Sequence, residues 1–239
     1  MLRPRAPVAL VGSGEFLPVM EEVDRELLAG RPPVLAFLPT AAGQEGPGRI
    51  QYWLRLAESH ARRLGVEPVP VPVLDRADAE RTDLADRLAG AGLVYLSGGN
   101  PGYLADTLRK SPVLDAIVAA WEGGAALAGC SAGAAALSEV AHELPTDVRR
   151  LGLGLIRGLV VIPHFDQVEH RAPEIIGRSV SSLTDGQLLV GIDENTALVG
   201  GPDRWRVRGR GRVSVIDTEG RRHVHPTDTE LTIAAEPDA

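Results

Sequence analysis

The chain has 239 residues, of which 44% are hydrophobic and 24% charged, as in an ordinary globular protein long enough to bury a full core. Its net charge of −7 argues against non-specific nucleic-acid binding, and its single cysteine excludes an internal disulfide framework and a zinc site built from several cysteines. No apolar stretch approaches the roughly 20 residues of a membrane span and no signal-peptide pattern is present, so we expect a cytoplasmic protein.

Short apolar runs alternate with amphipathic helical patterns through the first part of the chain. The expected elements, in chain order, are a strand at 8–12, a helix at 18–28, a strand at 34–38, a helix at 50–64, a proline-interrupted edge strand at 69–73, a helix at 78–88, a strand at 92–96, helices at 103–108 and 113–121, and a strand at 125–128. This alternation predicts an α/β fold with a largely parallel sheet and helices on both faces.

The pattern changes after Val140. The expected elements there are a strand at 159–162, a helix at 167–182, strands at 188–192 and 197–199, a hairpin of 205–208 with 212–216 around Gly209 and Gly211, and a last strand at 229–233. No repeat and no linker long enough to separate domains is visible, so we expect a single domain over 1–239.

The segment Gly129-Cys-Ser131-Ala132-Gly133 follows a buried strand and precedes a run of helix-forming small residues. This strand, sharp turn and helix pattern is typical of a nucleophile elbow, G-x-S-x-G, which lifts a serine hydroxyl clear of the sheet edge. Backbone N–H groups at the start of the following helix point toward developing negative charge. The same glycines also suit a strand-to-helix turn that serves packing alone. Ser131 is therefore a candidate nucleophile, and Cys130, one residue before it, is expected to be a small buried hydrophobe.

A serine nucleophile needs a base and an orienting carboxylate. His164 ends the apolar run 159–163, so it lies where this fold class places chemistry, although a satisfied structural histidine is the alternative. Asp193 and Glu194 end another strand and point to opposite sides if that strand continues, so only one of them can face the histidine. Asp147 is a competing carboxylate from the loop after the elbow helix.

The other histidines carry weaker signals. We expect His60 and His170 to be on solvated helix faces, His142 to be at an active-site rim or on the surface, and His223 and His225 to be in an arginine-rich segment with no evident partner.

Four ordered motifs together resemble one family of serine peptidases, family S51, which contains dipeptidase E and cyanophycinase. The motifs are Gly98-Gly99-Asn100, Gly129-Cys-Ser131-Ala-Gly133, Pro163-His164-Phe165-Asp166 and Gly191-Ile-Asp-Glu194-Asn-Thr-Ala197, and the similarity runs from about Val8 to Val199. The resemblance implies the three-layer α/β/α sandwich of class I glutamine amidotransferases, a flavodoxin-like architecture, with serine in place of their cysteine.

The resemblance also implies roles for individual residues. Ser131 would be the nucleophile, His164 the general base, and Glu194 the third member, with Asp147 as the alternative acid. The backbone N–H groups of Gly99 and Ala132 would form the oxyanion hole, and Asn100 would line the substrate pocket. No metal ion or cofactor is implied, and a homodimer is common in the family.

Substrate class follows from the arginines near the histidine. Cyanophycinase carries several arginines after its histidine, whereas only Arg171 is in reach here. Dipeptidase E needs a cation for the carboxylate of an N-terminal aspartate, and Arg171 or Arg178 could supply it. Both arginines could equally cover a solvated helix face. We expect a small, Asp-containing peptide as substrate, with a cyanophycinase-like exopeptidase acting on β-Asp-Arg as the alternative.

A second class of hypothesis is a non-catalytic, amidotransferase-like binding module. Gly12-Ser13-Gly14 lacks the third glycine of a dinucleotide-binding fingerprint, because Leu17 stands in its place. The register of the elbow argues against an amidotransferase, whose cysteine occupies the middle of the motif, where Ser131 stands here. The serine, the histidine and the acid are all present, which favours a hydrolase.

Overall fold

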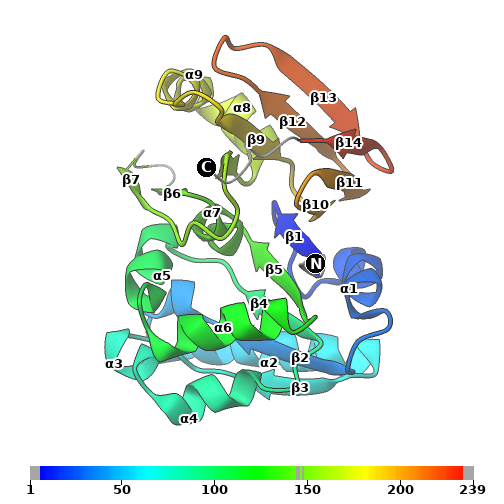
Figure 1. Cartoon of the computed structure of the whole chain (residues 1–239), viewed down its shortest axis with the longest axis vertical. Coiled ribbons are helices and arrows are strands. Elements are labelled where there is room, and N and C mark those ends of the chain that lie inside the picture. Colours follow the sequence, from blue (N-terminus) through cyan, green and yellow to red (C-terminus); the bar gives the residue numbers. More distant parts are fainter. Residues whose placement is uncertain (1–5, 144–145, 147, 234–239) are drawn as a thin grey trace.

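The computed structural model describes residues 6–143, 146 and 148–233, and its centre is an eight-stranded sheet (Figure 1). In spatial order the strands are β14 (Glu230–Thr232), β11 (Arg204–Gly209), β10 (Thr196–Gly200), β1 (Val8–Val11), β5 (Ala126–Cys130), β4 (Leu93–Leu96), β2 (Val34–Leu38) and β3 (Glu67–Pro70). The strands from β1 to β3 are parallel, and β10, β11 and β14 each pair antiparallel with their neighbour. β3, rich in proline, lies at the edge as the sequence predicts.

Helices cover both faces of this sheet. Along β1, Val8 and Leu10 face one core cluster while Ala9 and Val11 face the other, as strand alternation requires. The first cluster includes residues of α3 (Arg76–Ala79), α4 (Thr82–Ala85), α5 (Pro101–Leu108), α6 (Pro112–Glu122) and α7 (Ala132–Leu137), and the second those of α1 (Glu21–Leu28) and α2 (Pro47–Leu64). The predicted three-layer α/β/α sandwich with a large, mostly parallel sheet is confirmed.

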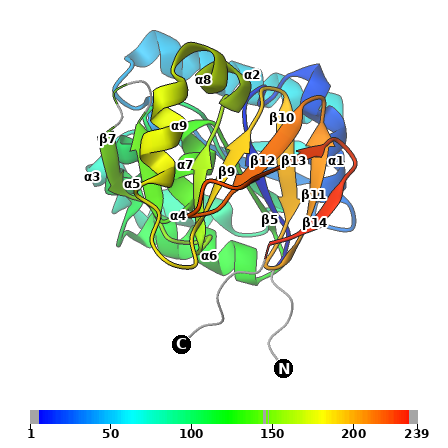
Figure 2. The ribbon, with the colours of Figure 1, turned by 90° about the horizontal axis from the view of Figure 1, so that it is seen from above.

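A second, four-stranded sheet lies beside the carboxyl ends of the parallel strands. Its order is β13 (Arg222–Pro226), β12 (Arg212–Ile216), β9 (Leu188–Ile192) and β8 (Leu159–Ile162). Figures 1 and 2 show this sheet with α8 (Phe165–Arg171) and α9 (Pro173–Val180), whose residues share its apolar core. A separate two-stranded sheet pairs β6 (Val140–Glu143) with β7 (Val148–Leu151). No helix in the described part of the chain has the length and apolar character needed to cross a membrane.

The expected hairpin of 205–208 with 212–216 is wrong. β11 pairs with β10 and β14, whereas β12 pairs with β9 and β13, so the two strands belong to different sheets. The two residues between the strands bond to the end of the β9–β10 loop and the start of β10 instead of closing a hairpin turn. The Arg210 N–H donates to the Asn195 carbonyl (2.9 Å), and the Gly211 N–H donates to Thr196 Oγ1 (2.8 Å). The C-terminal hairpin that does form joins β12 to β13.

Two predicted helices are interrupted. The expected helix at 167–182 is α8 followed by α9, with the break at Ala172, whose backbone (φ −150°, ψ 56°) leaves the helical region. Pro173 explains it, since a residue before proline disfavours the α conformation. The expected helix at 78–88 is α3, α4 and a 3₁₀ turn η3 (Asp86–Leu88). In the region expected as a helix at 18–28, a 3₁₀ turn η1 (Pro18–Met20) precedes α1.

Two histidines assigned to the surface or rim are buried. His60 is fully buried, and its Nε2 lies 2.7 Å from Asp24 Oδ2, joining α2 to α1. Burial raises the pKa of the Asp24 carboxyl, and the hydrogen bond from His60 opposes that shift. His60 stands three residues after Ala57 and four before Leu64, so it belongs to the apolar stripe of α2. His142, on β6, is 2% exposed and lies against Ser179 of α9.

Candidate active site

The turn between β5 and α7 places Ser131 in a strained conformation. Its φ of 51° and ψ of −112° are outside the regions that residues with a Cβ ordinarily occupy. The Ser131 N–H donates to the Val11 carbonyl of β1 (2.8 Å), which fixes the turn to the sheet. A Cβ at Gly129 would lie 2.6 Å from the carbonyl of Gly133, and one at Gly133 would overlap the Leu96 carbonyl of β4. Strand and helix can therefore cross only with glycine at both positions.

His164 and Glu194 come from the second sheet and meet Ser131 at this turn. The Ser131 Oγ lies 2.9 Å from His164 Nε2, and His164 Nδ1 lies 2.9 Å from Glu194 Oε1. With the proton on Nδ1, His164 donates to the Glu194 carboxylate and accepts from the Ser131 hydroxyl. The side chains of His164 and Glu194 are 37% and 38% exposed, so the base is open to a ligand. His164 has a left-handed backbone (φ 50°, ψ 38°) where β8 ends and α8 begins.

The backbone at Glu194 and Asn195 is held by side chains from α8 and from the loop after β1. The Glu194 N–H donates to Asp166 Oδ1 (3.0 Å), and the Asn195 N–H donates to Ser13 Oγ in the loop after β1 (3.2 Å). Asp193 faces the other way, where its Oδ2 accepts from the backbone N–H (3.0 Å) and Nε (3.2 Å) of Arg212. The two carboxylates thus point to opposite sides, as the alternation predicts, and the one that faces His164 is Glu194. Asp147 lies outside the described residues.

The Gly98-Gly99-Asn100 loop after β4 lies beside the serine. A Cβ at Gly98 would be 3.4 Å from Ser131 Cβ, and Gly99 has a φ of 144°, where a Cβ would overlap the Ala41 carbonyl. Gly98 and Asn100 use their N–H groups for Glu15 Oε1 (3.0 Å) and the Ala41 carbonyl (2.8 Å). Among the described residues, the N–H of Gly99 has no acceptor. Ala132, the first residue of α7, has no intrahelical acceptor for its N–H either.

Cys130 and Asn100 have structural partners. Cys130 is fully buried, and its thiol donates to Glu15 Oε2 (2.9 Å). Burial, reinforced by the Glu15 carboxylate, raises the pKa of this thiol well above its ordinary value, so it stays protonated at neutral pH. The Asn100 side chain caps α5 by accepting from the Tyr103 N–H (2.7 Å). The sequence analysis did not single out Glu15. The signal that could have indicated a buried acidic residue is its position between the glycine turn at 12–14 and the apolar residue Phe16.

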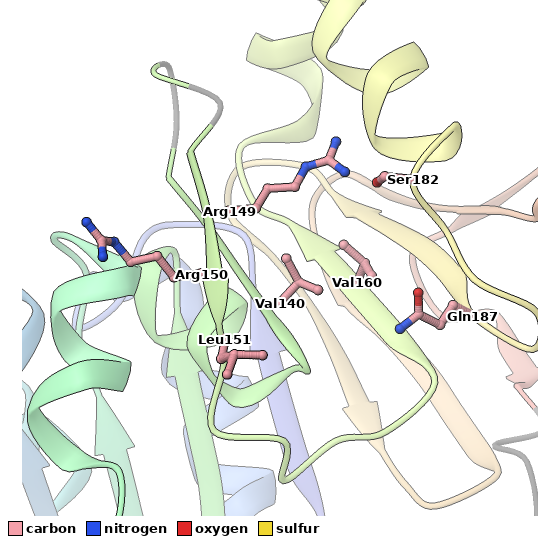
Figure 3. Close-up of a pocket in the computed structure, with 7 residues that line it drawn as sticks. All are labelled: Val140, Arg149, Arg150, Leu151, Val160, Ser182 and Gln187. Carbon is pink, nitrogen blue, oxygen red and sulfur yellow. The ribbon is translucent and has the colours of Figure 1, made fainter.

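The arginines considered for substrate binding lie on the helices that follow His164. Arg171 is the last residue of α8 and Arg178 lies in α9, and both are exposed. A cavity of about 300 Å³ lies between the β6–β7 sheet and β8 (Figure 3). Its lining residues are Val140, Arg149, Arg150, Leu151, Val160, Ser182 and Gln187, so it contains none of Ser131, His164 and Glu194.

The site and fold define a class of protein: an α/β sandwich in which a serine at a strained elbow is hydrogen-bonded to a histidine, and the histidine to a glutamate. The family model of peptidase family S51 matches residues 8–207, and the chain belongs to this family.

Individual relatives agree with the assignment. The chain is 33% identical over 199 residues to a cyanophycinase from Synechococcus elongatus, covering 77% of this chain but 58% of the length of that protein. The crystal structure of a peptidase from an acI-B1 actinobacterium is 36% identical, with a TM-score of 0.86 over 95% of this chain and 97% of that one. A putative peptidase E from Listeria monocytogenes EGD-e is 16% identical, with a TM-score of 0.64 over 86% and 98%, and shows the fold alone.

Proposed function

We propose that this protein is a serine peptidase that hydrolyses small, Asp-containing peptides through an acyl-enzyme. The observation that carries the proposal is the pair of 2.9 Å hydrogen bonds that joins Ser131 to His164 and His164 to Glu194. This arrangement has the order and the distances of a nucleophile, a general base and an orienting acid. Membership of family S51 supports the same reaction class.

The proposed mechanism is acyl transfer. His164 accepts the Ser131 proton as the hydroxyl oxygen attacks the scissile carbonyl, and Glu194 holds the imidazole with its proton on Nδ1. The N–H groups of Gly99 and Ala132 stabilise the oxyanion; this role is supported by the free donor at Gly99 and by the position of Ala132 at a helix start. His164 then protonates the leaving amine, and water attacks the acyl-enzyme with His164 again as base.

The preference for an acidic peptide rests on the arginines after His164. Arg171 or Arg178 would bind the substrate carboxylate, since a guanidinium can pair with it through two hydrogen bonds. Asn100 would line the same pocket. A cyanophycinase-like exopeptidase that cleaves β-Asp-Arg is the second candidate, and it is favoured by the 33% identity to the Synechococcus protein.

A dipeptide panel tests the proposal. Asp-X, Ala-X, Arg-X and β-Asp-Arg are incubated with the wild-type protein, with Ser131→Ala, with Arg171→Ala and Arg178→Ala, and with Arg62→Ala as a control for losing an exposed arginine of α2. We expect cleavage of Asp-X, a loss of roughly 10³-fold or more in Ser131→Ala, and a raised KM in one of the two arginine variants alone.

The other results discriminate the alternatives. Serine-dependent cleavage of β-Asp-Arg establishes the cyanophycinase-like activity instead. Equal turnover by Ser131→Ala contradicts the catalytic assignment. If a fluorophosphonate probe does not label Ser131 in the folded protein, the result contradicts catalysis and favours the binding module.

A further inference from the structure

Glu15 is a buried carboxylate that the proposed mechanism does not use. It is 6% exposed, in the turn after β1 that is closed by the Leu17 N–H donating to the Gly14 carbonyl (3.1 Å). Its two oxygens have different partners: Oε1 accepts from the Gly98 N–H (3.0 Å), and Oε2 accepts from the Cys130 thiol (2.9 Å). Among the described residues, no lysine or arginine is paired with this carboxylate.

Burying an unpaired carboxylate is costly, and an apolar side chain or an amide at this position would cost less. Two neutral donors in place of a cation compensate only part of the lost hydration. Stability alone therefore does not account for a glutamate here, and its partners indicate another role.

Each partner of Glu15 directly precedes a residue of the site. Gly98 precedes Gly99, the proposed oxyanion donor, and Cys130 precedes the nucleophile Ser131. One donor lies in the loop after β4 and the other ends β5, and they come 83 and 115 residues after Glu15. One carboxylate thus spans the loop after β4 and the end of β5, the two segments whose separation sets the distance from an oxyanion donor to the attacking oxygen.

The contact between Glu15 and Gly98 is also close enough to fix the position of the Gly98 backbone. A Cβ at Gly98 would lie 2.9 Å from Glu15 Oε1 and 3.8 Å from Ser131 Oγ, so Gly98 is packed closely against both the carboxylate and the serine. Because the Gly98 N–H is used by Glu15, only the next N–H in the loop, that of Gly99, is left to face a ligand.

We propose that Glu15 is a positioning residue that sets the oxyanion loop at Gly98-Gly99 against the nucleophile elbow by bridging the Gly98 N–H and the Cys130 thiol. The inference rests on the proposed serine peptidase function. Glu15 touches neither the reacting atoms nor the base; it acts through the backbone of two neighbouring residues. Its loss should weaken stabilisation of the transition state more than binding of the substrate.

The test compares Glu15→Ala and Glu15→Gln with the wild type. Asp24→Asn is the matched control, because Asp24 is also a buried carboxylate but bonds to His60 instead of the site. We expect Glu15→Ala to lower kcat about 10²-fold, which is the loss expected when the Gly99 N–H is displaced by up to about 1 Å from the oxyanion. KM should stay within about threefold of the wild-type value. Glu15→Gln keeps an oxygen that can accept the Gly98 N–H, so it should stay within about tenfold of the wild type. Asp24→Asn should keep the wild-type kcat.

A second measurement does not depend on turnover. Hydrogen exchange of the Gly98 amide, followed in a peptide that spans Ser97–Asn100, should accelerate in Glu15→Ala and remain slow in Glu15→Gln. The Glu15→Gln variant also keeps the test open if Glu15→Ala does not fold.

Several results would overturn the inference. These are an unchanged Gly98 exchange in Glu15→Ala, equal losses of kcat in the alanine and glutamine variants, or a raised KM with kcat preserved. Labelling of wild-type Ser131 by a fluorophosphonate tests the proposed function separately. Labelled wild type with unchanged Gly98 exchange in Glu15→Ala contradicts the role of Glu15 alone, whereas unlabelled wild type contradicts the peptidase.

Discussion

Ser131, His164 and Asn195 all have a positive φ, at 51°, 50° and 53°. Such backbones cost about 1–3 kcal/mol each in residues with a Cβ and persist only where the surroundings impose them. All three stand at or next to a member of the Ser131–His164–Glu194 arrangement. The Ser131 N–H donates to β1, the His164 carbonyl accepts from α8, and Asn195 bonds through its N–H to the loop after β1 and through its carbonyl to the segment between β11 and β12. Each turn that aims a proposed catalytic side chain therefore contains such a backbone; in the described part of the chain, Phe16, Lys110 and Asp228 have a positive φ elsewhere.

At the residue scale, Glu194→Gln tests the proposed acid. An amide can hold the imidazole in the wrong tautomer and cannot stabilise its charged form, so we expect kcat to fall about 10²- to 10⁴-fold. Steady-state hydrolysis of the best dipeptide measures the loss. Glu122→Gln, an exposed glutamate at the end of α6, is the control and should keep full activity. A Glu194→Gln variant that kept more than about a tenth of wild-type kcat would transfer the role to another carboxylate, such as Asp147.

At the element scale, α1 and α2 are joined by a buried polar pair. The rings of His60 and Phe16 are 5.6 Å apart, and Arg63 Nη2 reaches both His60 Nδ1 (3.2 Å) and the Phe16 carbonyl (2.7 Å). The His60–Asp24 pair therefore joins the two helices, and Arg63 joins α2 to Phe16 in the middle of the β1–α1 connection.

We predict that His60→Ala lowers the free energy of unfolding by about 3–5 kcal/mol, because it leaves the Asp24 carboxylate buried without its partner. His60→Gln retains an N–H donor and should lose less. Urea denaturation of the three proteins measures both effects. Equal destabilisation by alanine and glutamine would show that packing volume, rather than the hydrogen bond to Asp24, accounts for the loss.

At the scale of the whole molecule, the site exists only where two sheets meet. Ser131 follows β5 of the large sheet, while His164 and Glu194 follow β8 and β9 of the small one. Gly12, directly after β1, forms a close contact between them: a Cβ there would overlap the Asp193 carbonyl and lie 2.6 Å from that of Ile192. The distance from Ser131 to its base thus depends on a glycine that touches neither.

Gly12→Ala should separate the sheets and lower kcat by about 10²-fold, as expected for a displacement near 1 Å between nucleophile and base. Gly48→Ala is the matched control, since a Cβ at Gly48 in α2 meets no atom and its backbone φ is not positive. That change should leave kcat unaltered and stabilise the helix by up to about 1 kcal/mol. Equal activities of the two variants would contradict this account of the sheet contact.

The sequence by itself determined the features that depend on neighbours along the chain. Short apolar runs between helical patterns predicted the strands from β1 to β5, and the glycine register of 129–133 predicted the elbow. Strand ends predicted that His164 would meet one of the two carboxylates Asp193 and Glu194, and the family resemblance favoured Glu194. These patterns are local, and a parallel sheet brings the carboxyl ends of its strands together whatever the remaining details.

Only the tertiary structure decided the features that depend on distant partners. Strands 205–208 and 212–216 are neighbours in sequence but pair into different sheets, because the intervening residues bond to the β9–β10 loop. Polar residues such as His60 and Glu15 are buried because Asp24, Gly98 and Cys130 supply hydrogen bonds from elsewhere in the chain. The sequence alone predicts that a charged side chain is exposed. Burying it costs free energy of hydration, and only a hydrogen-bonding partner, which the fold supplies, compensates for that cost.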